Sequence, residues 1–185
     1  MARRKPWSPN AGIGVPGGGF KTVVITSHPA DIELKPPAYS DSPTTTPMRR
    51  AANVLYVEDS AGDVLLTGQT LAEALRPVNL TIARDGIEAL MMLANPSFAP
   101  ALIILDLNLP ALSGFDVLER NPRRDIPVVI FSASMNKADV DRAFAQGAVE
   151  YIQKPMDLRA YKEAVLAMID LWAFTGTDAD EAGTA

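Results

Sequence analysis

Residues 102–114, "LIILDLNLPALSG", contain the stretch that decides the fold. Leu102–Leu105 form an unbroken apolar run, which is typical of a parallel strand buried on both faces. The run ends on a carboxylate, Asp106, which is followed by Asn108 and Pro110. In open parallel sheets, ligands bind outside the carboxyl ends of the strands. The stretch therefore predicts a central strand that holds a charged group at the sheet edge where function is located.

The same alternation extends through the rest of the domain, which predicts an α/β protein. We expect five strands, over residues 53–57, 78–83, 101–105, 127–131 and 149–153. We expect five helices between and after them, over residues 60–75, 86–94, 113–121, 136–146 and 157–173. This order predicts a doubly wound, five-stranded parallel sheet with helices on both faces. Pro122 should end the third helix early, and Gly147 should end the fourth in a left-handed conformation.

The first helix carries the clearest local signals. Val64, Gly68, Leu71 and Leu75 recur on one face, and Ser60 with Asp63 forms a capping-box pattern. We expect this face to pack on the sheet.

The flanking segments differ in composition from the domain. Residues 1–47 hold 8 of the 15 prolines and 5 of the 12 glycines, so we expect 1–50 to be a disordered extension. Within it, "FKTVVITSH" (20–28) is a candidate short strand with no identifiable partner, and Met48 is an alternative start of the protein. Residues 51–174 form the domain, and 175–185 form a flexible acidic tail.

Composition excludes several classes of function. The 185-residue chain has no cysteine, so neither disulfides nor thiolate chemistry is expected. Residues 48–185 carry nineteen Asp/Glu against twelve Lys/Arg, which argues against direct nucleic-acid binding. The apolar runs fall short of the roughly 20 residues of a membrane span, and no secretion signal is evident. We expect a cytoplasmic protein.

Chemically capable side chains follow the strands at the edge where ligands bind. Glu58 and Asp59 follow the first strand, Asp106 the third, Ser132 the fourth and Lys154 the fifth. Two carboxylates about 4 Å apart repel by about 4 kcal/mol near a protein surface, and one lysine does not balance three of them. Oxygen ligands favour a hard cation such as Mg²⁺. A carboxylate beside Mg²⁺ and an ammonium is a nucleophile suited to phosphoryl groups.

The segments "YVEDSAGD", "LDLNLPALSGFDVL", "IPVVIFSAS" and "GAVEYIQKP" resemble the receiver domain of two-component response regulators. The resemblance covers roughly residues 52–173 and implies a flavodoxin-like sheet of order 2-1-3-4-5.

The resemblance also implies a role for each matching residue. Asp106 would be the phosphoacceptor, Lys154 would pair with the phosphate, and Ser132 and Tyr151 would form the switch. Mg²⁺ would be bound by Asp59, Asp106 and the main-chain carbonyl of Asn108, and through water by Glu58. Pro155 would follow a cis peptide bond.

Finer features are similar to small regulators associated with phytochrome-type histidine kinases. They are "VEDSAGDVLLTGQTL", "DLNLP" and "MIDLWAFTGT". One feature departs from the family: between Gly114 and Pro127 the chain is about one helical turn short, so we expect a truncated third helix.

The resulting hypothesis is a single-domain response regulator, not an enzyme beyond its own phosphorylation and dephosphorylation. Its partner would be a histidine kinase or a phosphotransfer protein, and its output a protein contact, including a homodimer through the fourth and fifth helices. Three alternatives remain. A dehalogenase-type phosphatase would have Asp where Asn108 stands, a flavin module would have a Ser/Thr-rich loop in place of "EDSAGD", and a receiver-like binding module would work without phosphorylation.

Overall fold

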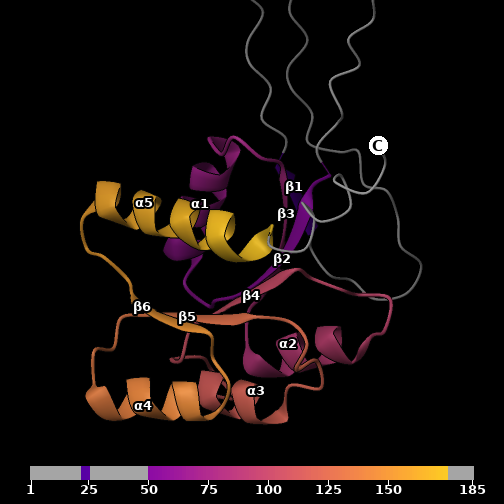
Figure 1. Cartoon of the computed structure of the whole chain (residues 1–185), viewed down its shortest axis with the longest axis vertical. Coiled ribbons are helices and arrows are strands. Elements are labelled where there is room, and N and C mark those ends of the chain that lie inside the picture. Colours follow the sequence, from indigo (N-terminus) through magenta and orange to yellow (C-terminus); the bar gives the residue numbers. More distant parts are fainter. Residues whose placement is uncertain (1–21, 26–49, 175–185) are drawn as a thin grey trace, which may run out of the picture.

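The computed structural model describes residues 50–174 and the backbone of residues 22–25. Its centre is a six-stranded sheet of order β1-β3-β2-β4-β5-β6 (Figure 1). The strands are β1 (Thr22–Ile25), β2 (Ala52–Val57), β3 (Val78–Ala83), β4 (Leu102–Leu105), β5 (Val128–Ser132) and β6 (Glu150–Gln153). From β2 to β6 all neighbours are parallel. The five parallel strands β2 to β6 confirm the predicted sheet. Numbered one to five in chain order, they lie in the order 2-1-3-4-5 across it, as predicted.

The sixth strand, β1, was not part of the predicted sheet. Thr22–Ile25 pairs antiparallel with β3, with Thr22 opposite Thr81 and Ile25 opposite Val78. The stretch with no identifiable partner therefore forms a strand, and its partner is the outer edge of β3. The sequence gives no direct sign of this pairing, because it joins segments more than fifty residues apart. The predicted disorder of the rest of the extension, and of the acidic tail, falls outside the described residues.

The helices begin and end close to the predicted positions. They are α1 (Ala61–Ala72), α2 (Gly86–Ala94), α3 (Gly114–Arg120), α4 (Lys137–Ala145) and α5 (Leu158–Met168), which continues into a π-helical turn, η1 (Ile169–Ala173). At seven residues, α3 is the shortest of the five, in agreement with the expected truncation. Gly147, after α4, has φ of 101° and forms the predicted left-handed end.

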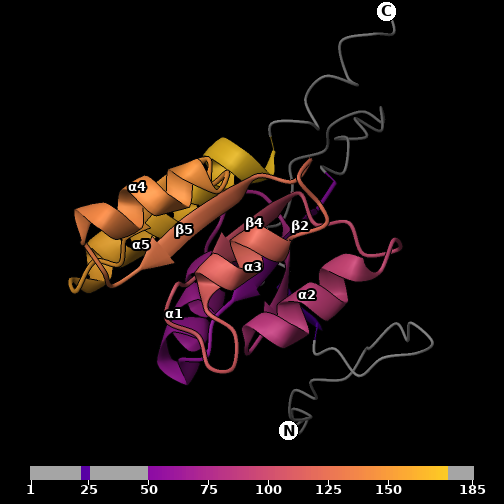
Figure 2. The ribbon, with the colours of Figure 1, turned by 90° about the horizontal axis from the view of Figure 1, so that it is seen from below.

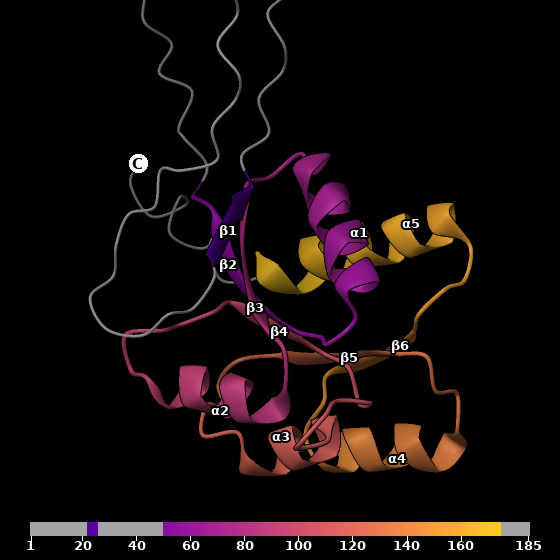
Figure 3. The same cartoon turned by 180° about the vertical axis from the view of Figure 1, so that it is seen from behind.

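The helices cover both faces of the sheet and create two cores. α1 and α5 lie on one face, and α2, α3 and α4 on the other (Figures 1 and 3). Figure 2 shows α3 between α2 and α4. Alternate residues of β4 enter opposite cores, with Leu102 and Ile104 under α1 and α5, and Ile103 and Leu105 under the other helices. Burial on both sides explains the unbroken apolar run.

The predicted apolar face of α1 is only partly correct. Leu71 is buried, but the side chain of Leu75 is fully exposed. Instead Thr67 and Thr70 face the core, each 0% exposed. The reason is that α1 ends at Ala72, so Leu75 no longer follows the helical repeat.

The loop after β4 is held tightly against the strand end. Ala111 adopts a positive φ of 62°. The Gly114 N–H donates to the Leu107 carbonyl at 3.0 Å. A Cβ at Gly114 would collide with the Asp106 carbonyl oxygen, so only glycine fits there without movement.

Candidate functional site

One lysine and three carboxylates meet at the carboxyl edge of the sheet. Lys154, which follows β6, places its Nζ 2.7 Å from Asp106 Oδ2 after β4, and 2.5 Å from Glu58 Oε2 after β2. The third partner is Asp63 in the first turn of α1, with Oδ2 at 2.7 Å. The Lys154 side chain is 10% exposed. The parallel strands therefore bring Glu58, Asp106 and Lys154, three of the predicted groups, to one point.

Asp106 is fully engaged by donors. Its Oδ1 accepts hydrogen bonds from Ser132 Oγ at 2.7 Å and from the Asn108 N–H at 3.1 Å, while Oδ2 faces Lys154. Burial alone would raise the pKa of Asp106, but the hydrogen bonds from Lys154 and Ser132 outweigh it and lower that pKa. Asp106 is consequently an anion, and its geometry is fixed on both oxygens.

Glu58 lies deeper, at 1% exposure. Its Oε1 accepts from the Ser60 N–H at 3.0 Å, and its Oε2 from Tyr56 Oη at 3.0 Å as well as from Lys154. Burial raises the pKa of Glu58 in spite of the lysine. In the same way, burial raises the pKa of Tyr56, and the neighbouring Glu58 charge adds to the effect.

Lys154 is the balancing charge of the cluster. Burial would lower the pKa of its ammonium, but Asp106, Asp63 and Glu58 together raise it. The ammonium therefore stays charged. One positive charge among three carboxylates still leaves a negative excess, which favours a further cation at this edge.

Asp63 is the partner that sequence reasoning missed. Ser60 does cap α1 by accepting from the Asp63 N–H at 3.3 Å. However, the Asp63 carboxylate points to Lys154, and Glu58 takes its place on the Ser60 N–H. The predicted capping box is therefore half formed. The sequence did contain a signal for the contact between Asp63 and Lys154. Carboxylates outnumber lysines near the strand ends, and Asp63 is one more carboxylate within reach of Lys154, the lysine that follows a strand.

Other predicted site residues lie differently. Asp59 is exposed at the rim, outside the carboxylate contacts of Lys154. Asn108 is also exposed, and its contact with the site is the N–H bond to Asp106. The peptide bond before Pro155 is trans, so the expected cis bond was wrong; trans is the intrinsically favoured isomer. Tyr151 is half-buried and donates from Oη to the Ser134 carbonyl at 2.9 Å, which ties it to the loop after β5.

The donor set fits a hard divalent cation better than a soft one. Within residues 50–174, no three His, Cys, Asp or Glu side chains are grouped to hold an ion by themselves. A cation here would need Asp59 and Asp106 together with main-chain oxygen and water, which is how Mg²⁺ is commonly held. The negative excess around Lys154 supplies the charge for it. The Mg²⁺ roles of Glu58, Asp59, Asp106 and Asn108 stay predictions.

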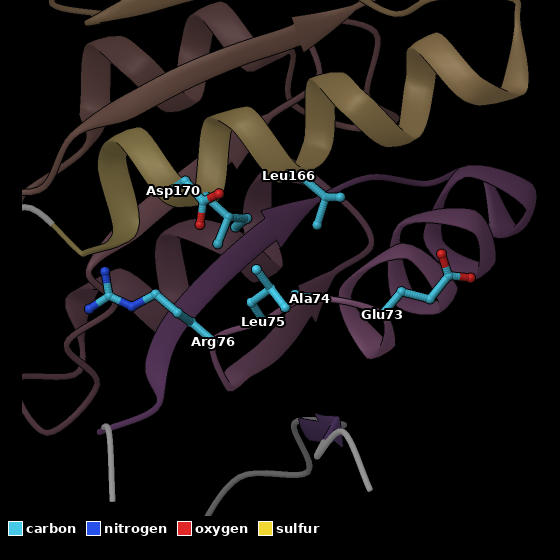
Figure 4. Close-up of a pocket in the computed structure, with 7 residues that line it drawn as sticks. Glu73, Ala74, Leu75, Arg76, Leu166 and Asp170 are labelled. Atoms are coloured by element: carbon cyan, nitrogen blue, oxygen red, sulfur yellow. The ribbon is translucent and has the colours of Figure 1, made fainter. Parts of the chain in front are cut away.

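A cavity of about 380 Å³ lies elsewhere in the molecule. It is lined by the segment after α1, Glu73–Arg76, and by Leu166, Ile169 and Asp170 at the end of α5 (Figure 4). Because Arg76 and Pro77 immediately precede β3, this cavity belongs to the amino edge of the sheet. It is therefore remote from Asp106.

The doubly wound sheet and its acidic site with a paired lysine define a class of α/β protein that places a reactive carboxylate at the carboxyl edge of the strands. The chain belongs to the response regulator receiver domain family, whose sequence profile matches residues 54–166. It is thus a receiver domain of two-component signalling. Of the helices that the structure describes, none combines the length and apolar character needed to cross a bilayer.

Two curated relatives show how the similarity is distributed. Response regulator Rcp1 of Synechocystis is 34% identical over 133 residues, covering 67% of this chain and 90% of Rcp1. A probable cyclic di-GMP phosphodiesterase of Vibrio cholerae is 33% identical over 116 residues, covering 60% of this chain but only 25% of that protein. The likeness to the second protein is therefore limited to a quarter of its length.

Two solved structures of response regulators are also similar to this chain over nearly their whole length. The phosphorylated cyanobacterial phytochrome response regulator RcpA superposes with a TM-score of 0.63 at 33% identity, covering 69% of this chain and 98% of RcpA. The Mn²⁺-bound form of Rcp1 gives a TM-score of 0.61 at 33% identity, covering 68% and 97%. Each is a protein to which this chain is similar in fold and in sequence.

Proposed function

We propose that this chain is a phosphorylation-dependent signalling switch that accepts one phosphoryl group on Asp106. The observation that carries the proposal is the position of Asp106, whose Oδ2 lies 2.7 Å from Lys154 Nζ and whose Oδ1 accepts from Ser132 Oγ at 2.7 Å. An ionised carboxylate with a fixed ammonium beside it is arranged to attack phosphorus and to have the resulting charge neutralised.

The transfer step follows from these contacts. An Asp106 oxygen forms the new bond to phosphorus, and the bond from phosphorus to the donor's leaving group breaks, with its electron pair departing on that group. Lys154 stabilises the phosphoryl oxygens, and Ser132 Oγ is placed to donate to one of them. Mg²⁺, when bound near Asp59, Asp106 and the Asn108 carbonyl, would supply the remaining neutralisation.

The switch would run through the loop after β5. Ser132 lies at the end of β5, and the Tyr151 hydroxyl holds the Ser134 carbonyl two residues further on. Movement of Ser132 toward a phosphoryl group would disturb this loop and the neighbouring α4. We place the output in protein contacts of that surface, including a homodimer through α4 and α5, and we place the protein in the cytoplasm.

The donor we propose is a histidine kinase of the phytochrome type, or a phosphotransfer protein fed by it. Similarity to Rcp1 and RcpA over nearly their whole length supports this choice. Phosphotransfer from such a kinase to the purified chain, compared with transfer from an unrelated kinase, tests it directly.

The central experiment uses a small phosphodonor, acetyl phosphate, with Mg²⁺ and intact-mass spectrometry. We expect one phosphate per chain, none in Asp106→Asn, and normal labelling in Asp116→Asn, a carboxylate engaged in the cap of α3. Labelling that persists in Asp106→Asn would refute the assignment. Partner binding unchanged in both Asp106→Asn and Asp106→Glu would instead favour the phosphorylation-independent module.

A further inference from the structure

A line of buried hydroxyl groups runs from the site into the core between α1 and α5. Tyr56 Oη donates to Glu58 Oε2 at 3.0 Å, Tyr161 Oη of α5 lies 3.4 Å from Tyr56 Oη, and Thr67 Oγ1 of α1 lies 3.0 Å from Tyr161 Oη. Tyr56 and Thr67 are 0% exposed and Tyr161 is 3% exposed. Three polar groups therefore lie where apolar side chains would normally pack.

The hydrogen bond at the Glu58 end of the line has a fixed direction. Each hydroxyl has one proton to donate. Tyr56 donates its proton to Glu58, so it can only accept from Tyr161. The Tyr161 hydroxyl also has the Asp63 carbonyl as an acceptor at 3.4 Å, and either hydroxyl can be the donor in its 3.0 Å contact with Thr67. The line thus ends on the Glu58 carboxylate, with Tyr56 as the donor to it.

Burying this line of hydroxyl groups costs free energy of folding, and the need to fill space in the core does not account for it. Buried hydroxyls are destabilising unless they are hydrogen-bonded. Phe at positions 56 and 161 and Val at 67 would fill nearly the same space without that cost. A chain of hydroxyls ending on a charge is mutually polarised and strengthens the last bond. The hydrogen bond from Tyr56 therefore holds the Glu58 carboxylate in one position.

Glu58 needs this support when the site changes state. At 1% exposure it has three donors, namely Lys154, the Ser60 N–H and Tyr56. If Lys154 turns toward a phosphoryl group on Asp106, only the Ser60 N–H and Tyr56 remain. A buried carboxylate that loses a donor shifts or rotates, and the acidic edge around it changes shape.

We infer that Tyr56 is a positioning residue that fixes the Glu58 carboxylate for the divalent cation, and that Tyr161 and Thr67 hold Tyr56 in place. This inference rests on the cation part of the proposed function. It also means that α1 and α5 are each tied to the site by a side chain in the core.

The test measures binding of Mn²⁺ alone by the paramagnetic resonance signal of the free ion, with no phosphodonor present. We expect Tyr56→Phe to weaken binding about tenfold, the lower end of the range for removal of a group behind a metal ligand. Thr67→Val should weaken it by a smaller factor. Thr70→Val is the matched control, because Thr70 lies on the same helix, is 0% exposed and donates only to the Leu66 carbonyl at 2.8 Å.

The outcomes distinguish the positioning role of Tyr56 from the proposed phosphorylation of Asp106. Wild-type binding in Tyr56→Phe, or equal effects of Thr67→Val and Thr70→Val, would overturn the inference, as would absence of Mn²⁺ binding in the wild type. Tyr56→Phe and Tyr161→Phe should also be non-additive when combined. If Asp106 accepts no phosphate while Tyr56→Phe still weakens Mn²⁺ binding, the proposed function fails and this inference stands.

Discussion

Lys154 Nζ lies 2.7 Å from Asp106 Oδ2, although the two residues are 48 positions apart. They meet because β4 and β6 are parallel strands on either side of β5, so both chains leave the sheet at the same edge. The ion pair is buried, with side-chain exposures of 10% and 8%. Removal of either partner would therefore leave a buried charge uncompensated, and the pair places a positive charge beside the predicted phosphoacceptor.

Removing the lysine charge should cost stability as well as function. In Lys154→Met the three carboxylates lose their shared cation, and breaking a buried pair in this way costs about 3 kcal/mol. We expect a fall of that size in the free energy of unfolding, measured with urea, and a smaller fall when Mg²⁺ is added. Lys162→Met is the control, since its partner Glu73 is 62% exposed and the pair is worth less than about 1 kcal/mol. Equal losses in the two variants would contradict the role of burial.

Substitution by alanine should have opposite effects on stability at two glycines, Gly114 and Gly62. At Gly114 a Cβ meets the Asp106 carbonyl oxygen and Leu107 Cα, so Gly114→Ala must push the loop away from the strand end. We expect about 2 kcal/mol of destabilisation and slower labelling by acetyl phosphate.

At Gly62, in α1, the nearest atom to a Cβ is Ser60 Oγ at 3.8 Å, an ordinary contact. Gly62→Ala should leave stability unchanged or slightly higher, because alanine favours the helix. The pair is compared by urea denaturation, and a loss at Gly62 as large as that at Gly114 would show that crowding is not the cause.

The strand β1 should protect one edge of the sheet. In a version of the protein that starts at Met48, β3 loses its antiparallel partner, and its outward N–H groups are free to exchange. We expect faster hydrogen exchange on alternate residues of Val78–Thr81, the part of β3 that pairs with β1, observed by NMR. β6 lies at the opposite edge of the sheet, where its one partner among the described strands is β5, and it should exchange at the same rate in both versions. Unchanged exchange in β3 would mean that β1 gives no protection.

The cap of α3 predicts a pH effect. The side-chain hydrogen bond from Ser113 Oγ to Asp116 Oδ2, 2.6 Å long, and the bond from the Ser113 N–H lower the pKa of Asp116. A lowered folded pKa gives a stabilisation that is complete above the unfolded value, about 3.9, and is lost as the pH falls through the folded value. Ser113→Ala should therefore raise the Asp116 pKa, measured by NMR titration. The pKa of Asp125, which Arg123 lowers, should not move.

The fold was largely predictable because its signals are local. Apolar runs, Pro122, Gly147 and the capping residues set the order and approximate ends of the elements, and their alternation implies a parallel sheet. The missed features are long-range. The β1–β3 pairing joins distant segments, and the exposure of Leu75 depends on where α1 ends, three residues before it. Neither is encoded in a short pattern.

For the site, the sequence alone determined which chemical groups stand at the strand ends, because a residue that follows a parallel strand must emerge at that edge. Only the tertiary structure decided how they are shared. It directed Asp63 to Lys154 in place of the helix cap, left Asp59 at the rim, and aligned Tyr56, Tyr161 and Thr67 behind Glu58. These choices depend on side-chain directions across β2, α1 and α5. Such directions follow from packing between elements and are not set by the pattern within any one of them.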